Sequence, residues 1–477
     1  MMPSWRDALA RLAASLRRGG ISKRQIGRIY AEAARSCERS SQWPRALQLL
    51  AEARTGGRAQ PSLVFFTVAA SSFGRAELWP QAIALLTEAA KLGLTPDCIL
   101  YNAIVGACGR AAQWSSAVYL AKQMHLRMLE PDVVTFSTAI TALSRGSSWD
   151  LAICTLEDMH TKALSPNLVT YNAAITACSQ GHSWPLALGL LRGLPRWRQR
   201  ADVITYNAAI TACEKGSNAV AALALLAETR SQAVDADIVT YNATISACGA
   251  GARWVDALTL LDSARDRSVK LDAISYSAAI TAAGEGLQWR LSLSLLLEIP
   301  LVALKADTIS WSAAIGACER SHRWAHSLEL LREMQIQALT PSIIAVNAAL
   351  SACEKAQHWT VALQLLDRIE SWNLQPSSVT LNASIKACER GLLWERGLDL
   401  LAPGPSFCGR QPKPHPDAGS YCAAFLALPV EEADRVLELL AEMPGRGVQP
   451  DALVYRTATE CLLRAGDVIN ARVVYRL

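Results

Sequence analysis

The sequence predicts an all-α protein, a right-handed α-solenoid (superhelix) of about 12–13 stacked helix–turn–helix repeats of 35 residues. Three observations support this prediction. Tryptophan recurs every 35 residues, cysteine recurs six residues before it, and a small polar residue forms a third series. Helix pairs of this size cannot bury their apolar faces alone, so each has to stack on its neighbours.

The composition excludes several other classes of protein. The 477 residues would make about three ordinary domains, and 51% hydrophobic with 19% charged residues excludes disorder for most of the chain. The net charge of +5 is compatible with a nucleic-acid partner without requiring one. An uninterrupted apolar stretch of about 20 residues is missing, so we expect no membrane span. The 13 cysteines include no C-x-x-C pair, so we expect no zinc or other metal site.

The period fixes the boundaries of the repeats. The tryptophan series is Trp79, Trp114, Trp149, Trp184, Trp254, Trp289, Trp324, Trp359 and Trp394, preceded by Trp43, with Ala219 at the missing place. The cysteine series is Cys37, Cys108, Cys178, Cys213, Cys248, Cys318, Cys353 and Cys388. Repeats begin four residues before the polar series, at 27, 63, 98, 133, 168, 203, 238, 273, 308, 343, 378, 418 and 452.

The regular period covers only part of the chain, which suggests five segments. They are a basic N-terminal segment at 1–26, a divergent first repeat at 27–62, a core array at 63–402, a Pro-rich interruption at 403–417 and divergent C-terminal repeats that cap the array at 418–477. The interruption lengthens the repeat that starts at 378 to 40 residues and is expected to be a loop.

Each repeat is expected to contain two helices. In 203–237, the segment VITYNAAITACEKG has apolar residues at helical spacing and ends at Gly216, and AVAALALLAETRSQA forms the second helix. The threonine that precedes Tyr-Asn, at Thr170, Thr205 and Thr240, is predicted to cap the first helix.

Most repeated residues are explained by packing. We expect the tryptophans to pack between repeats rather than to form a stacking platform for bases, and the cysteines to be free, buried thiols. Equivalent cysteines would be about 8–10 Å apart, beyond the reach of a disulfide, which favours a reducing compartment. His182, His322 and His358 are expected to be solvated turn residues.

The polar series is less easily explained in this way. The fifth residue of the ten repeats from 63 to 378 is always Asn, Ser or Thr, and the last residue is Asp, Asn or Ser. Asparagine is a poor helix former. One alternative is that the last residue caps the next helix. The other is that these small polar side chains point outward and recognise a ligand.

The sequence resembles the pentatricopeptide repeat family in its pure-repeat P-class form, over about 27–477. The resemblance rests on the 35-residue period, the Asp-Val-Val-Thr-Phe-Ser and Asp-Val-Ile-Thr-Tyr-Asn openings at 132–137 and 202–207, and the Ala-Leu…Leu-Leu second helices. It implies a partner, single-stranded RNA, bound at one nucleotide per repeat. An H-x-E motif, as in zinc deaminases, is absent and little chain follows 452, so we expect neither an enzyme nor a cofactor, small-molecule substrate or membrane partner.

The resemblance also implies roles for individual residues. Bases would be read by pairs of fifth and last residues: Thr67 and Asp97, Asn102 and Asp132, Ser137 and Asn167, Asn172 and Asp202, Asn207 and Asp237, Asn242 and Asp272, Ser277 and Asp307, Ser312 and Ser342, Asn347 and Ser377, Asn382 and Asp417. The family's code for these pairs implies a target near GUAUUUG(A/G)CU. Because of the Pro-rich interruption, we expect Asp417 to lie out of position.

Two further sets of residues are implied. The second residues would sandwich the bases, the alternative being core packing: Val64, Ile99, Val134, Val169, Ile204, Val239, Ile274, Ile309, Ile344 and Val379. Basic residues near the end of the first helix would contact phosphates: Arg110, Arg145, Lys215, Arg320, Lys355 and Arg390. At this position the repeats from 168, 238 and 273 have Gln180, Ala250 and Glu285 instead.

The first 30 residues carry seven basic residues and one acid, a composition typical of a transit peptide, with a basic capping helix as the alternative. Together with the resemblance, this favours a chloroplast (plastid) or mitochondrial location, the plastid being slightly preferred. The function predicted is processing, stabilisation or translation of an organellar RNA, with RNA-processing proteins as further partners. The alternative is a protein-binding scaffold that uses the same groove for a peptide.

Overall fold

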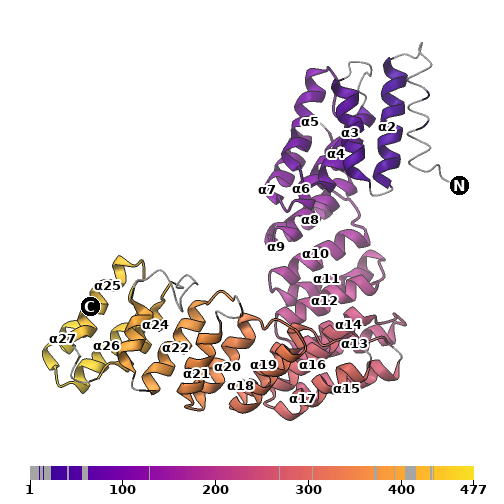
Figure 1. Ribbon diagram of the computed structural model, residues 1–477. Coiled ribbons are helices and arrows are strands. Elements are labelled where there is room, and N and C mark those ends of the chain that lie inside the picture. The colour runs from indigo at the N-terminus through magenta and orange to yellow at the C-terminus, as the bar shows by residue number, and fades with distance from the viewer. Residues whose placement is uncertain are drawn as a thin grey trace. The chain divides into compact units, whose positions relative to one another are not determined.

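The computed structural model describes residues 10, 14, 23–39, 42–55, 63–127, 129–267, 269–302, 304–369, 372, 374–391, 393–402, 415–429, 432 and 434–476. Every regular element in this described part is a helix, and the helices alternate along the chain as first and second members of hairpins (Figure 1). None of them is long and apolar enough to cross a membrane.

The first helices of the repeats are α2 (Lys23–Arg39), α4 (Leu63–Arg75), α6 (Cys98–Arg110), α8 (Val133–Arg145), α10 (Leu168–Gln180), α12 (Val203–Lys215), α14 (Ile238–Ala250), α16 (Ala273–Glu285), α18 (Thr308–Arg320), α20 (Ile343–Lys355), α22 (Ser378–Arg390), α24 (Ala418–Ala427) and α26 (Ala452–Arg464). The second helices are α3 (Trp43–Thr55), α5 (Trp79–Lys91), α7 (Trp114–Leu126), α9 (Trp149–Thr161), α11 (Trp184–Gly193), α13 (Ala219–Ser231), α15 (Trp254–Asp266), α17 (Trp289–Leu301), α19 (Trp324–Ile336), α21 (Trp359–Ile369), α23 (Trp394–Leu401), α25 (Asp434–Gly445) and α27 (Val468–Arg476).

The helix boundaries agree with the predicted repeats. From α4 to α22, and again at α24 and α26, the first helix starts at the first residue of the repeat, and each tryptophan of the series starts a second helix. The prediction is wrong at the N-terminal end, where α2 begins at Lys23 instead of at 27. Helix α11 is short because Pro195 lacks an amide hydrogen, and a 3-10 turn over Leu194–Trp197 follows it.

The first helices are capped by the residue that precedes them, and the prediction of a threonine cap is wrong. Asp202 is the N-cap of α12: its Oδ1 accepts the backbone N–H of Thr205 at 2.8 Å, and the Thr205 hydroxyl accepts the N–H of Asp202 at 3.2 Å. Thr205 is therefore the third residue of the helix, in a capping box. In each of the ten core repeats, from Asp97 to Asp417, the side chain of the last residue likewise accepts the backbone N–H three positions later.

Tryptophan joins successive repeats, as predicted. The Trp149 ring, from the start of α9, lies against Gly181 at the end of α10 so closely that a Cβ on this glycine would overlap the indole. Gly181 has φ −84° and ψ 10°, a conformation open to any residue, so close approach and not backbone conformation is what requires glycine here. Trp114 and Gly146 are related in the same way.

The core consists of small and aliphatic side chains with the cysteine series inside it. All eight cysteines of the series are buried and free, and burial raises the pKa of the Cys178 and Cys213 thiols to about 11. The prediction for the turn histidines holds, because His182, His322 and His358 are all exposed and lie between helices. The His358 ring packs on Trp324 with 4.0 Å between the ring centroids.

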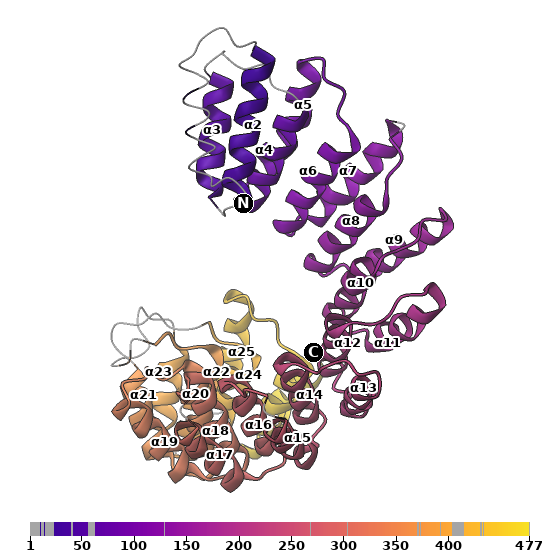
Figure 2. The ribbon, with the colours of Figure 1, turned by 90° about the vertical axis from the view of Figure 1, so that its right-hand side faces the viewer.

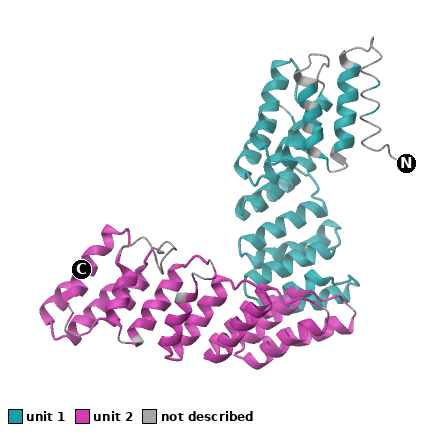
Figure 3. Cartoon of the chain, in the orientation of Figure 1, with its two compact units in different colours: residues 1–243 teal, residues 244–477 magenta. Residues whose placement is uncertain are grey.

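The chain divides into two compact units, residues 1–243 and 244–477, with the border inside α14 (Figures 2 and 3). In each unit, consecutive first helices contact one another, as α8, α10 and α12 do in unit 1 and α18, α20 and α22 do in unit 2. Second helices contact the first helix of their own repeat and that of the next, as α9 does with α8 and α10 in unit 1 and α19 does with α18 and α20 in unit 2. Each unit is therefore a stack of helical pairs in which one face of every first helix remains uncovered by the second helices.

Candidate nucleic-acid interface

The second residue of each core repeat is exposed. The ten valine and isoleucine side chains at this position are between 48% and 70% accessible, whereas the third and fourth residues of the same helices are buried or nearly so. Core packing, one of the two explanations for these residues, is therefore excluded. A β-branched apolar side chain stands at the same place on the surface of every core repeat.

The fifth-position asparagines lie one helical turn away and are hydrogen bonded to the next repeat. In α10, Asn172 Nδ2 donates to Asp202 Oδ1 at 3.3 Å, and Asn172 Oδ1 accepts the Thr205 hydroxyl at 2.7 Å. Asn102 and Asn207 make the same two bonds to the first turns of α8 and α14. Capping, the first of the two alternatives for the last residue, is therefore observed, and the same carboxylate also holds the asparagine of the preceding repeat.

The fifth and last residues predicted to act as pairs are in contact in most repeats. Besides the three Asn–Asp pairs above, Asn347 donates to Ser377 at 3.3 Å and the Ser312 and Ser342 hydroxyls lie 2.9 Å apart. Asn382 Nδ2 lies 3.1 and 3.2 Å from the two Asp417 oxygens. The expectation that the Pro-rich interruption moves Asp417 out of position is wrong, because Asp417 caps α24 in the usual register. Asn242 belongs to unit 1, and its predicted partner Asp272 caps α16 in unit 2.

Where the fifth residue has a hydroxyl, the side chain folds back on its own helix. Ser137 donates to the Val133 carbonyl at 2.6 Å and lies 2.6 Å from the Thr170 hydroxyl, and Ser277 makes the equivalent contacts with Ala273 and Ser310. Both serines are buried. These repeats therefore present a smaller, recessed polar group in place of an amide.

Asp132, Asp202 and Asp237, which hold the asparagines of the preceding repeats, are ionised acceptors. Burial raises the pKa of Asp202, but the hydrogen bonds from Thr205 and Asn172 lower it more, so that the pKa falls below its ordinary value of 3.8. The same balance lowers the pKa of Asp132 and Asp237. An ionised carboxylate only accepts, so it holds the asparagine with Nδ2 toward it. One N–H and one lone pair of each such amide remain available to a ligand.

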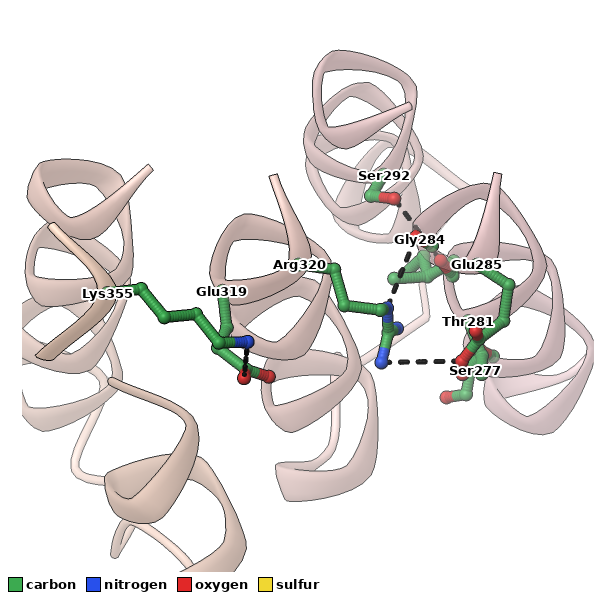
Figure 4. A network of polar contacts seen from close by, with 9 residues as sticks. Ser277, Thr281, Gly284, Glu285, Ser292, Glu319, Arg320 and Lys355 are labelled. Carbon is green, nitrogen blue, oxygen red and sulfur yellow. Dashed lines mark hydrogen bonds and ion pairs between the residues drawn. The ribbon is translucent and has the colours of Figure 1, made fainter. Parts of the chain in front are cut away.

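Two of the predicted phosphate contacts are occupied by acidic partners in unit 2 (Figure 4). The Arg320 guanidinium lies 3.3 Å from a Glu285 oxygen and donates to the Gly284 carbonyl at 3.2 Å. Lys355 Nζ lies 2.8 Å from Glu319. Both bridges connect the ends of consecutive first helices, so a phosphate would have to displace a carboxylate there.

The remaining basic residues differ from these two. Arg145 and Lys215 are exposed and make no ion pair within the described part of the chain. Arg110 is exposed too, and its guanidinium lies where a Cβ on Gly74 would be. The side chain of Arg390 lies outside the described residues. The described residues contain no group of three or more His, Cys, Asp or Glu able to hold a metal ion.

Sequence reasoning assigned no role in the interface to the third residue of the repeat. Thr135, Thr205, Thr240 and Thr380 each donate to an asparagine of the preceding repeat. The sequence did carry a signal: each repeat with a fifth-position asparagine is followed by one that has Thr or Ser at its third position.

Comparison with known proteins agrees with this architecture. Sequence profiles of the PPR repeat family match residues 131–180, those of the pentatricopeptide repeat domain match 191–251 and 329–390, and a PPR repeat profile matches 309–336. Over these residues the chain consists of pentatricopeptide repeats. No protein of curated function matches the sequence significantly.

Solved structures are similar in fold. The crystal structure of the pentatricopeptide repeat protein PPR10 from maize matches with a TM-score of 0.68 at 19% identity, covering 99% of this chain and 71% of that chain. PPR10 in complex with an 18-nt psaJ RNA element matches with a TM-score of 0.52 at 19% identity, covering 94% and 79%. At 19% identity, these comparisons show similarity of fold alone.

Proposed function

We propose that this protein binds single-stranded RNA in a sequence-specific manner, with about one nucleotide for each core repeat. The observation that carries the proposal is the row of ten exposed Val and Ile side chains at the second position, each one turn from a partly satisfied polar side chain. Flat apolar base faces and polar base edges require these two kinds of group side by side. The RNA-bound form of PPR10, a protein of similar fold, supports the proposal.

The geometry of the asparagines favours uracil. An amide held with Nδ2 toward Asp202 presents its second N–H and a lone pair of Oδ1, in a fixed order, to whatever lies against it. A uracil edge offers a carbonyl oxygen and an N3–H, which complement these two groups. We therefore assign U to Asn102, Asn172, Asn207, Asn242 and Asn382, in line with the code that the family implies.

Serine as the last residue of a repeat holds the asparagine differently from aspartate. The Ser377 hydroxyl, unlike a carboxylate, can donate as well as accept, and so can the Thr380 hydroxyl on Asn347 Oδ1, so these two partners together do not force one orientation on Asn347. An amide that can reverse also matches cytosine, whose edge has an acceptor at N3 and a donor at N4. The recessed Ser137 and Ser277 leave room for a larger purine. The proposed target is therefore close to GUAUUUG(A/G)CU.

We further propose that the protein acts on an organellar transcript, in a plastid or a mitochondrion, and influences its processing, stability or translation by occupying the site. The basic segment at 1–26 supports an organellar location, and most of this segment lies outside the described residues. Exposed Arg145 and Lys215 supply the cationic contacts for the RNA backbone in unit 1. RNA-processing proteins are proposed as additional partners.

Selection from a randomised RNA pool, followed by binding measurements over a range of salt concentrations, tests this function. The expected result is enrichment of sequences near GUAUUUG(A/G)CU, tighter binding of this RNA than of a scrambled one, and an affinity that falls as salt rises. The proposal would be refuted if the selection enriched no sequence and the protein bound the coded and the scrambled RNA with equal affinity. A peptide-binding scaffold would give that result.

A further inference from the structure

The contacts between a fifth-position asparagine and the next repeat form a closed circuit of hydrogen bonds. Asp202 N–H donates to the Thr205 hydroxyl at 3.2 Å, and this hydroxyl lies 2.7 Å from Asn172 Oδ1. Asn172 Nδ2 donates to Asp202 Oδ1 at 3.3 Å, and the Thr205 backbone N–H donates to the same oxygen at 2.8 Å. The circuit recurs at Asn102 with Thr135 and Asp132, and at Asn207 with Thr240 and Asp237, where the distances from the threonine hydroxyl to the amide oxygen are 2.6 and 2.5 Å.

Counting donors assigns the hydroxyl proton. The Thr205 hydroxyl has one hydrogen and two acceptors within reach, Asn172 Oδ1 and Asp202 Oδ1 at 2.7 Å each. Asp202 Oδ1 already accepts two N–H groups, whereas no other donor within the described residues reaches Asn172 Oδ1. The proton therefore goes to the amide oxygen. A reversed amide would place its oxygen against the carboxylate and lose this bond.

Helix capping alone does not explain the hydroxyl. A capping box most often has Glu or Gln as its third residue, yet none of the core repeats has either at this position. A glutamate carboxylate could accept the N–H of Asp202 but could not donate to Asn172. The six repeats with a fifth-position asparagine are all followed by Thr or Ser: Thr135, Thr205, Thr240, Ser275, Thr380 and Ser420. Of the four fifth residues that are not amides, Thr67 and Ser312 are followed by Leu100 and Ala345, and Ser137 and Ser277 by Thr170 and Ser310.

We infer that a Thr or Ser at the third position of a repeat is a positioning residue for the nucleotide read by the preceding repeat. Together with the capping carboxylate, its hydroxyl locks the orientation of the asparagine amide and so makes the site distinguish uracil from cytosine, whose hydrogen-bonding edges are reversed in order. This inference rests on the proposed function. It also predicts an offset: a change in one repeat alters recognition of the nucleotide assigned to the repeat before it.

The test compares Thr205→Val with Thr205→Ser in the full chain. Binding is measured to the coded RNA and to RNAs with single changes at the fourth nucleotide, assigned to Asn172, or at the fifth, assigned to Asn207. In Thr205→Val we expect the preference for U over C at the fourth nucleotide to fall about fivefold to tenfold, the equivalent of one hydrogen bond. The preference at the fifth nucleotide stays unchanged. Thr205→Ser keeps the hydroxyl and restores the wild-type profile.

A purely structural role for Thr205 would give a different result. It would weaken binding equally for all RNAs, or reduce selectivity at the fifth nucleotide as much as at the fourth, and either result overturns the inference. Failure of Thr205→Ser to restore selectivity overturns it too. A wild-type protein that does not distinguish coded from scrambled RNA refutes the proposed function itself, which separates the two failures.

A gain-of-function variant covers the case in which Thr205→Val does not fold. Ala345 is buried at the third position, next to the Ser342 cap and without a hydroxyl for Ser312. Ala345→Ser supplies the hydroxyl that Ser310 supplies to Ser277. We expect the preference between bases at the eighth nucleotide to become several times sharper, with no change at the ninth. An unchanged profile at the eighth nucleotide overturns the inference.

Discussion

Replacing Asn207 by serine should change the fifth nucleotide of the target from U toward G. Asn207 is held by Asp237 at 3.1 Å and by the Thr240 hydroxyl at 2.5 Å, with the rest of its amide free to meet a base. Ser137 indicates where a serine would go: it bonds the carbonyl four residues earlier and the third-position hydroxyl of the next repeat, and it is buried. The variant therefore removes the amide and enlarges the space for the base.

The magnitude follows from the contacts that are exchanged. A base contact of good geometry contributes about 1–3 kcal/mol to discrimination, so the preference for U at the fifth nucleotide should fall by roughly 5- to 150-fold. The expected decrease in the free energy of unfolding is smaller than this change in discrimination. The two hydrogen bonds of Asn207 contribute about 0.5–1.5 kcal/mol each, and serine replaces most of that contribution by the two bonds that Ser137 makes.

Fluorescence anisotropy with four RNAs that differ only at the fifth nucleotide measures this change. Asn218→Ser is the matched control, because Asn218 lies in the same repeat but caps the second helix through the N–H of Ala221 at 3.0 Å. The control keeps a capping side chain and should bind all four RNAs as the wild type does. Equal weakening of all four RNAs by Asn207→Ser, or a change centred on another nucleotide, would refute the one-repeat, one-nucleotide reasoning.

Three further predictions concern the exposed row, the packing of repeats and the caps. Ile204→Ala should lower the affinity for RNA several-fold, because a base face loses apolar contact. Val220→Ala, a change at an equally exposed residue of the second helix, should leave the affinity unchanged, and both variants should melt like the wild type. An equal effect of the two variants on binding would contradict the assignment. Gly181→Ala should destabilise the fold by about 1–3 kcal/mol in denaturant unfolding, because its Cβ would overlap Trp149, whereas Gly189→Ala in open space should be neutral or stabilising by up to about 1 kcal/mol. Because the pKa of Asp202 is lowered in the fold, its stabilising contribution is complete above the unfolded pKa and is lost as the pH falls through the lowered value. The melting temperature should therefore decrease when the pH is lowered below about 4, and this decrease should be smaller in Asp202→Asn.

The sequence alone determined the architecture, because packing repeats with the chain. The spacing of Trp79, Trp114 and Trp149 gave the starts of the second helices without error, and Gly216 marked the end of a first helix. A tryptophan that has to fit the same gap in each repeat leaves a period that is visible without any structure.

Tertiary structure decided the roles of the polar residues. Asp202 and Thr205 both lie at a helix start, and either could cap it, so only the backbone geometry assigns the cap to Asp202 and the third position to Thr205. Asn172 bonds to residues 30 and 33 positions later: its pairing with Asp202 was implied by the family resemblance alone, and its contact with Thr205 became apparent only in the fold.

Exposure was likewise decided in three dimensions. A valine or isoleucine such as Ile204 most often belongs to a core, and the helical period alone places it on one face without telling whether that face is covered. In the fold, the second helices cover the opposite face of each first helix and leave Ile204 and its equivalents accessible. The period of a sequence records which residues are equivalent, whereas burial depends on which neighbours the folded chain brings against them.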